Sequence, residues 1–183
     1  FLCALGQFSR SDEKQVSINV SALSLRDPDF IRIALGRLGE MSLAEDEKII
    51  IEIHETTPEL KMSQDVLKLF RRAGVMFAID DIGLSMGDVL RLSEFEDIAD
   101  FIKLDRHSVC ADSEQPNALE YVISLVTSFL PDAVIVAEGV KTPQHARELY
   151  DAHPHIKYAQ GLYLTDNRDE FARDYKARRV RAA

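Results

Sequence analysis

The chain has 183 residues, 46% hydrophobic and 29% charged, which is the composition of a globular domain with a sizeable core rather than of a disordered segment. Its formal net charge of −9 excludes duplex nucleic acid as an expected partner, because such binding depends on clustered Lys and Arg. The apolar runs are shorter than a membrane span and no signal segment opens the chain, so we expect a cytoplasmic protein, although segments outside this sequence could tether a longer parent to a membrane.

The first elements have clear helical and strand patterns. Residues 1–9 carry apolar side chains in helical spacing, and residues 16–21 alternate between apolar and polar side chains as a strand requires. Asn19 falls on the polar face of that strand. A helix is predicted from Pro28, which suits a first helical turn, with Asp27 as its N-cap.

Five further runs have the composition of buried strands, with helical patterns between them. The predicted strands cover residues 48–55, 75–83, 99–105, 133–139 and 156–161. The predicted helices begin at Thr56 or Thr57, near Val89, at Pro116 or Asn117, and at Thr142, and the basic tail 169–183 is expected to be a solvated terminal helix. Strands that alternate with helices predict a parallel sheet with helices outside it.

Two architectures fit this alternation, an open doubly wound sheet and a (β/α) barrel. Polar residues at or near the carboxyl ends of the predicted strands discriminate between them: Asn19, Glu52, Asp80, Asp81, Lys103, Asp105, Glu138 and Gln160. A barrel brings all such ends to one rim, whereas an open sheet concentrates its site at one switch point. We therefore predict an α/β fold of the (β/α)8 TIM-barrel type. About six of the eight strands lie in this chain, as one domain over residues 1–183 with the missing strands upstream of Phe1.

Asp80 and Asp81 follow one another at the end of a buried strand, where two carboxylates repel each other and lose hydration unless a cation neutralises them. If only Asp80 and Asp81 are considered, the alternative to metal binding is that the two residues form a solvent-exposed turn. The whole rim is rich in oxygen ligands, which favours Mg²⁺ or Mn²⁺, and two such ions can promote phosphodiester hydrolysis. Lys103 would balance the negative charge of the acids, where it could face the bound water or a phosphate oxygen, or it would form a purely structural ion pair with Asp105 or Asp80. His54 is expected to pack or form hydrogen bonds rather than to ligate.

These segments resemble the successive motifs of the EAL domain, the bacterial phosphodiesterase module that hydrolyses cyclic di-GMP to linear pGpG. The matching segments are Asn19-Val20-Ser21, Glu52-Ile53-His54-Glu55, Ala78-Ile79-Asp80-Asp81-Ile82-Gly83, Lys103-Leu104-Asp105, Ala137-Glu138-Gly139-Val140 and Gln160-Gly161. Their order and spacing match from about Val16 to Leu164. The fold that the resemblance implies is a modified (β/α) barrel whose first strand runs antiparallel.

The resemblance also implies a role for each rim residue. The metal ligands of a two-ion Mg²⁺ or Mn²⁺ site would be Asn19, Glu52, Asp80 and Asp81. The catalytic residues, acting on the bound water and the phosphate, would be Lys103, Glu138 and Gln160. The supporting residues would be Glu55, which braces the loop after Asp81, and Asp105, beside the lysine.

Two departures from the family pattern keep an alternative open. The Glu-Ala-Leu segment that names the family has no counterpart here and is expected upstream of Phe1, and the loop at residues 82–88 differs from the family's Phe-Gly-Thr-Gly-Tyr-Ser-Ser. We therefore expect a cyclic di-GMP phosphodiesterase, with a degenerate EAL domain that acts as a cyclic di-GMP receptor or protein-interaction scaffold as the alternative. The implied partners are cyclic di-GMP, a GGDEF or sensor domain in the same polypeptide, and a second copy in a homodimer.

Overall fold

A computed structural model of the chain describes residues 1–9, 14–54, 64–85, 87–88, 92–93, 95–110 and 117–161. These residues fold around a parallel six-stranded sheet whose spatial order follows the chain order, β1 to β6. The strands are β1 (Gln15–Asn19), β2 (Lys48–Ile53), β3 (Val75–Ile82), β4 (Phe101–Leu104), β5 (Val134–Ala137) and β6 (Ile156–Ala159). A doubly wound sheet would reverse its strand order at a switch point, and this sheet does not, so its topology is that of a barrel.

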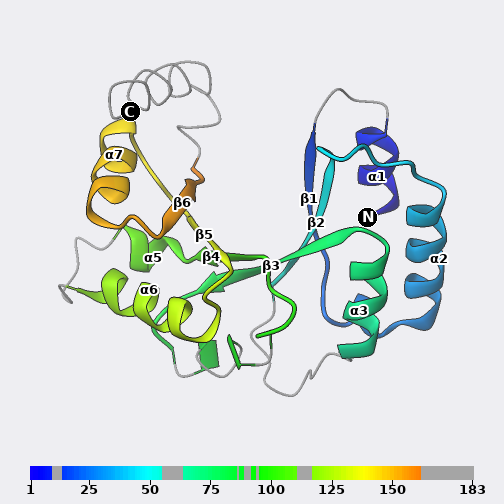
Figure 1. Ribbon diagram of the computed structural model, residues 1–183, viewed down its shortest axis with the longest axis horizontal. Helices are drawn as coiled ribbons and strands as arrows, with labels where there is room; N and C mark the ends of the chain where they lie inside the picture. Colours follow the sequence, from blue (N-terminus) through cyan, green and yellow to red (C-terminus); the bar gives the residue numbers. More distant parts are fainter. Residues whose placement is uncertain are drawn as a thin grey trace.

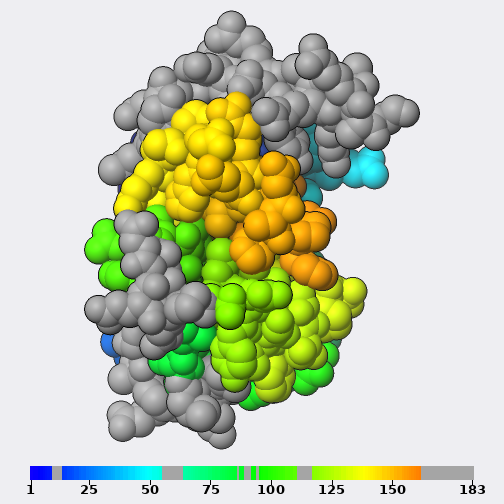
Figure 2. Space-filling model, turned by 90° about the vertical axis from the view of Figure 1, so that its left-hand side faces the viewer, coloured from blue at the N-terminus to red at the C-terminus, as the bar shows by residue number. Residues whose placement is uncertain are grey.

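The helices lie on the outer side of the curved sheet (Figure 1). They are α1 (Leu2–Phe8), α2 (Pro28–Gly39), α3 (Gln64–Arg72), α5 (Arg106–Val109), α6 (Ala118–Phe129) and α7 (Pro143–Ala152), with a 3₁₀ turn η1 (Ser24–Arg26) before α2. Side chains of α6 and α7, yellow-green to orange, make up much of the face seen in Figure 2. The short η1 and α5 were not predicted, because one turn of helix leaves no periodic pattern in the sequence.

The two faces of the sheet belong to different apolar clusters. Ile49 and Ile51 point outward into the main core with the helices, whereas Ile50 lies in a small inner cluster with Ala78 and Phe101. Successive residues of a strand point to opposite faces, so a strand that is apolar on both faces reads as a continuous apolar run. This explains the run of three isoleucines in β2.

The predicted helix ends are confirmed where the structure describes them. Asp27 accepts a hydrogen bond from the backbone N–H of Asp29 at 2.9 Å, and Thr142 accepts one from the N–H of His145 at 3.0 Å. Both caps precede a proline in the first turn, where a missing N–H costs no hydrogen bond. Gly74 follows α3 with φ +85°, the left-handed conformation of a helix C-terminus.

Several predictions fall outside the described residues. These are the start of the helix after Thr56 or Thr57, most of the helix near Val89, and the tail 169–183. Predicted strand 48–55 ends earlier, at Ile53. Among the residues that are described, none of the helices is both long and apolar enough to cross a membrane.

Candidate functional site

The amino group of Lys103 lies at the centre of a cluster of carboxylates. Its Nζ is 2.7 Å from Glu138 Oε1, 2.8 Å from Glu52 Oε2 and 3.0 Å from Asp80 Oδ1. The lysine is only 5% exposed, and its three partners come from the carboxyl ends of β2, β3 and β5. The barrel-like order of the strands thus brings together groups that are up to 86 residues apart in the sequence.

Burial and the hydrogen bonds of Lys103 shift the pKa values of Lys103 and Glu138 in opposite directions. Burial lowers the pKa of the Lys103 ammonium, but its hydrogen bonds to Glu138, Glu52 and Asp80 outweigh burial and raise that pKa above its ordinary value. Burial raises the pKa of the Glu138 carboxyl, as do the charges of Asp80 and Asp81, and the hydrogen bond from Lys103 offsets this only in part. Lys103 is therefore a permanent cation at neutral pH.

Asp81 is brought to the same side as Asp80 by an unusual backbone conformation. Neighbours on a strand normally point to opposite faces, but Asp81 has φ 54° and the register of β3 against β4 shifts between Ile79 and Ile82. As a result Asp80, Asp81 and Glu138 each offer an oxygen within 4.8 Å of the others'. A set of carboxylate oxygens at this spacing fits Mg²⁺ or Mn²⁺.

His54 extends the cluster on the side of Asp81. It follows β2 and shares a face with Glu52, two residues earlier. Its Nδ1 is 3.0 Å from Asp81 Oδ2 and 4.0 Å from Asp80 Oδ2. The expected hydrogen-bonding role agrees with this contact.

Strand β1 contributes Asn19 and an unpredicted residue, Ser17. Asn19 is the register partner of Glu52 across β1 and β2 and is exposed at the rim. The Ser17 hydroxyl donates to Glu52 Oε1, on the carboxylate whose other oxygen contacts Lys103. Ser17 and Asn19 are two residues apart on the polar face of the strand, which is the pattern that could have identified Ser17.

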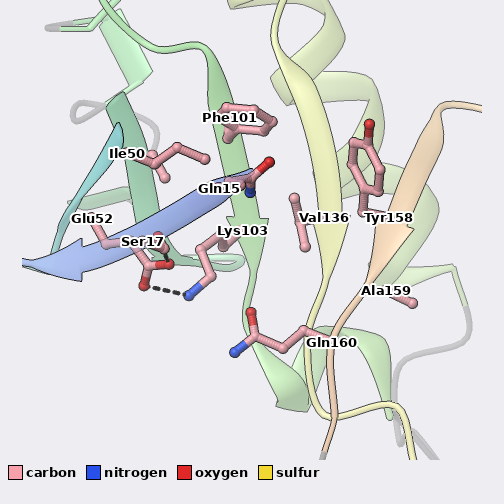
Figure 3. Close-up of a pocket in the computed structure, with 11 residues that line it drawn as sticks. Gln15, Ser17, Ile50, Glu52, Phe101, Lys103, Val136, Tyr158, Ala159 and Gln160 are labelled. Atoms are coloured by element: carbon pink, nitrogen blue, oxygen red, sulfur yellow. Dashed lines mark hydrogen bonds and ion pairs between the residues drawn. The ribbon is translucent and has the colours of Figure 1, made fainter. Parts of the chain in front are cut away.

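Gln160 lies between two cavities. It follows β6, where its backbone N–H donates to Ala137 O at 2.8 Å, and it lines both an inner cavity of about 270 Å³ and a mouth cavity of about 740 Å³. Figure 3 shows Lys103 and Glu52 meeting across the inner cavity, with the Gln160 amide at the same end. The mouth cavity is also lined by Asp81 and Glu138.

Asp105 is engaged in local structure rather than with the lysine. Its side chain caps α5, accepting from the Ser108 N–H at 2.7 Å and from the Ser108 hydroxyl at 3.2 Å. Asp105 also packs against Gly83, where an added Cβ would lie 2.1 Å from Asp105 Oδ2. The remaining predicted supporting residue, Glu55, lies outside the described residues.

The loop after β3 closes on itself where it is described. The Ser85 hydroxyl donates to Asp88 Oδ2 at 2.6 Å, and the Asp88 N–H donates back to Ser85 Oγ at 3.1 Å. The Ser85 backbone N–H also donates to Asp88 Oδ2, at 3.2 Å, and together with the bond from the Asp88 N–H to Ser85 Oγ this makes a capping box at a helix start. The Gly83 N–H also donates to Asp88 Oδ2, at 3.3 Å, so Asp88 holds this loop next to the acidic pair.

Comparison with known proteins identifies relatives over most of the chain. A family model described as "EAL domain" matches residues 2–166. The blue light- and temperature-regulated antirepressor BluF of Escherichia coli (strain K12) is 27% identical over 138 residues, which are 72% of this chain and 33% of BluF. The chain therefore spans about a third of the length of this curated relative.

Two solved structures are similar in both fold and sequence. The EAL domain of Mycobacterium smegmatis DcpA is 27% identical with a TM-score of 0.69, over 88% of this chain and 74% of that one. Klebsiella pneumoniae BlrP1, in a manganese and cyclic di-GMP complex, is 28% identical with a TM-score of 0.66, over 87% of this chain and 40% of that one. The predicted fold, six parallel strands of an EAL-type TIM barrel, is confirmed.

Proposed function

Because the chain belongs to the EAL domain family, we propose that its domain hydrolyses cyclic di-GMP to linear pGpG with Mg²⁺ or Mn²⁺ bound at the rim. The observation that carries this proposal is the clustering of ligand oxygens from Asp80, Asp81 and Glu138 within 4.8 Å at the mouth of the barrel. The manganese and cyclic di-GMP complex of the related BlrP1 supports the choice of cofactor and substrate.

In this proposal the ligands of the metal ions would be Asp80, Asp81, Glu52 and Asn19. The Glu138 carboxylate, with an oxygen within 4.8 Å of those of Asp80 and Asp81, would act on the bound water. When bound, the ions supply an activated water and stabilise the charge that develops on the phosphate. Glu52 already has one oxygen fixed by the Ser17 hydroxyl and the other by Lys103, so its carboxylate is held in a single orientation. Such preorganisation avoids a reorganisation cost when the charged substrate binds.

Lys103 and Glu138 would divide the proton chemistry between them. Lys103 keeps its proton at neutral pH, so it acts as a donor to the phosphate or the attacking water and not as a base. Glu138 has a raised pKa, which makes its carboxylate a stronger proton acceptor. Gln160 lines the same mouth cavity as Glu138 and supplies an amide for hydrogen bonding there.

The mouth cavity, about 740 Å³, has a size that suits a nucleotide ligand. Its lining includes acidic side chains together with Arg106 and His107. A dianionic dinucleotide would be repelled by the carboxylates alone, so bound cations and Arg106 would have to offset that repulsion.

The test is a hydrolysis assay on protein that contains this chain. We expect linear pGpG from cyclic di-GMP with Mn²⁺ or Mg²⁺, its loss on chelation, and recovery when the ion is restored. The Glu138→Gln variant should lose at least about a hundredfold in kcat, within the range of an acid–base group. A Glu148→Gln control changes an exposed acid on α7 and should retain full activity. No product from protein shown to bind Mn²⁺ would contradict the proposal.

A second candidate is binding without turnover, as a cyclic di-GMP receptor or a protein-interaction scaffold. Two observations favour it: the loop after β3 closes on itself through Ser85 and Asp88, and the curated relative BluF is named as an antirepressor. A receptor would give calorimetric binding of cyclic di-GMP without product, and a scaffold would give no stabilisation by the nucleotide. A GGDEF or sensor domain in the same polypeptide and a homodimer belong to the same proposal, tested by sequencing the parent gene and by light scattering.

A further inference from the structure

The acidic cluster consists of two halves that differ in the nitrogen group in contact with the carboxylates. Glu52, Asp80 and Glu138 all contact the Lys103 ammonium. Asp81 instead has His54 at its carboxylate, with Nδ1 3.0 Å from Oδ2. The side chains of Asp81 and His54 are 46% and 54% exposed, so this half of the cluster is open to solutes whereas the lysine half is buried.

The spacing of the two atoms suits ligands on one metal ion. Neighbouring ligands of an octahedral ion with bonds of about 2.1 Å lie about 3 Å apart, which is the separation of His54 Nδ1 and Asp81 Oδ2. The backbone supports the arrangement, because His54 is directed to the rim by its position two residues after Glu52. Asp81 is turned toward it by its left-handed φ of 54°.

From this contact, and resting on the proposed function, we infer that the ion bound by Asp81 takes a ring nitrogen of His54 as a ligand. The site therefore prefers Mn²⁺ and other transition-metal ions to Mg²⁺. Carboxylate and water ligands suit Mg²⁺ and Mn²⁺ alike, whereas an imidazole nitrogen suits transition-metal ions. His54 thus determines metal selectivity at an otherwise all-oxygen rim.

The rival explanation is that His54 only donates a hydrogen bond that orients the Asp81 carboxylate. A hydrogen bond and a pair of metal ligands both allow 3.0 Å between the nitrogen and the oxygen, so the distance does not separate them. The two explanations differ in whether the ion contacts His54. An imidazole that ligates Mn²⁺ receives spin density from the ion on its nitrogen, whereas an imidazole that only orients Asp81 does not.

The experiment uses the same protein as the hydrolysis assay, containing this chain, loaded with Mn²⁺ and no nucleotide. Pulsed electron paramagnetic resonance should show coupling of Mn²⁺ to a ¹⁴N nucleus in the wild type and lose it in His54→Gln. The control is His155→Gln, an exposed histidine at the opposite, amino end of β6, and it should keep the coupling. In calorimetry, His54→Gln should lose about tenfold or more in Mn²⁺ affinity, with Mg²⁺ affinity changed less than about twofold.

Loss of affinity for both ions alike, or nitrogen coupling that persists in His54→Gln, would overturn the inference, as would a wild type without coupling. Neither readout uses cyclic di-GMP. Coupling without any hydrolysis would therefore contradict the phosphodiesterase proposal alone, and hydrolysis without coupling would contradict the role of His54 alone. Because His54 is half exposed, we expect His54→Gln to fold, which a circular dichroism spectrum checks.

Discussion

Replacing Lys103 with methionine tests whether the buried cation is what makes the acidic cluster tolerable. Methionine keeps most of the length and volume of the lysine side chain but leaves Glu52, Asp80 and Glu138 without the ammonium that contacts all three. Their side chains are 12%, 13% and 18% exposed, so water can replace little of the lost interaction. We expect the metal-free chain to be severely destabilised near neutral pH.

The expected loss follows from the geometry. Removing one partner of a buried ion pair costs about 3–5 kcal/mol, because the other charge is left buried and uncompensated. Here three carboxylates lose contacts of 2.7–3.0 Å to one cation, which argues for the upper half of that range, about 4–5 kcal/mol. Domains have a total stability of about 5–15 kcal/mol, so the variant should unfold at a much lower urea concentration.

The loss of stability in the Lys103→Met variant should become smaller as the pH decreases. Burial and the charges of Asp80 and Asp81 raise the pKa of the Glu138 carboxyl, and the hydrogen bond from Lys103 partly offsets them. The Lys103→Met variant removes that bond, so the pKa of Glu138 rises further in the folded state. The folded variant then binds more protons than the unfolded chain, so its stability increases as the pH decreases through the raised pKa of Glu138. For each unit by which the pKa is raised, protonation increases the free energy of unfolding of the variant by about 1.4 kcal/mol. The raised pKa of Lys103 itself contributes stability that is lost only at strongly alkaline pH, outside this window.

The assay is urea unfolding followed by circular dichroism, in chelator, at about pH 5 and about pH 7.5. The Lys48→Met control removes an exposed lysine at the start of β2 and should change stability by less than about 0.5 kcal/mol. Excess Mn²⁺ should restore part of the stability of Lys103→Met, by about 2.7 kcal/mol at a hundredfold excess over Kd. A variant as stable as the wild type at the higher pH, or a deficit that grows on acidification, would refute the reasoning.

Two substitutions test the supporting structure. Gly139→Ala should destabilise the chain by about 1–3 kcal/mol in urea unfolding, because Gly139 has φ +69° and an added Cβ would lie 2.5 Å from the Cβ of Arg106. The matched Gly36→Ala, within α2 and with nothing within 4 Å, should stabilise by about 0.5–1 kcal/mol, and equal effects would contradict the argument. Arg71→Gln should lower the free energy of unfolding by about 1–2 kcal/mol, since the guanidinium makes two hydrogen bonds to Asp100 at 2.8 and 3.1 Å. An unchanged urea midpoint would show that this pair is dispensable.

The strands, their parallel arrangement and the convergence of polar residues were predictable from local pattern. Apolar runs that end in acids mark buried strands, and alternation with helices makes those strands parallel, so their carboxyl ends share one rim. That reasoning alone predicts that Glu52, Asp80, Lys103 and Glu138 lie together. In the structure each of the three carboxylates lies within hydrogen-bonding distance of the Lys103 ammonium. Hydrophobic periodicity is enough to predict these features, because it shows which residues along the chain are buried and which are exposed.

The contacts within the rim depend on features that no local pattern contains. The orientation of Asp81 results from a register shift between β3 and β4 and a left-handed backbone, and its pairing with His54 depends on how β2 and β3 align. Likewise, Lys103 could have paired with Asp105, two residues later in the chain, but the Asp105 side chain instead caps α5. Periodicity specifies which face a side chain occupies, whereas the choice among several partners on that face is made by distances of a few ångströms that arise only when distant strands pack together.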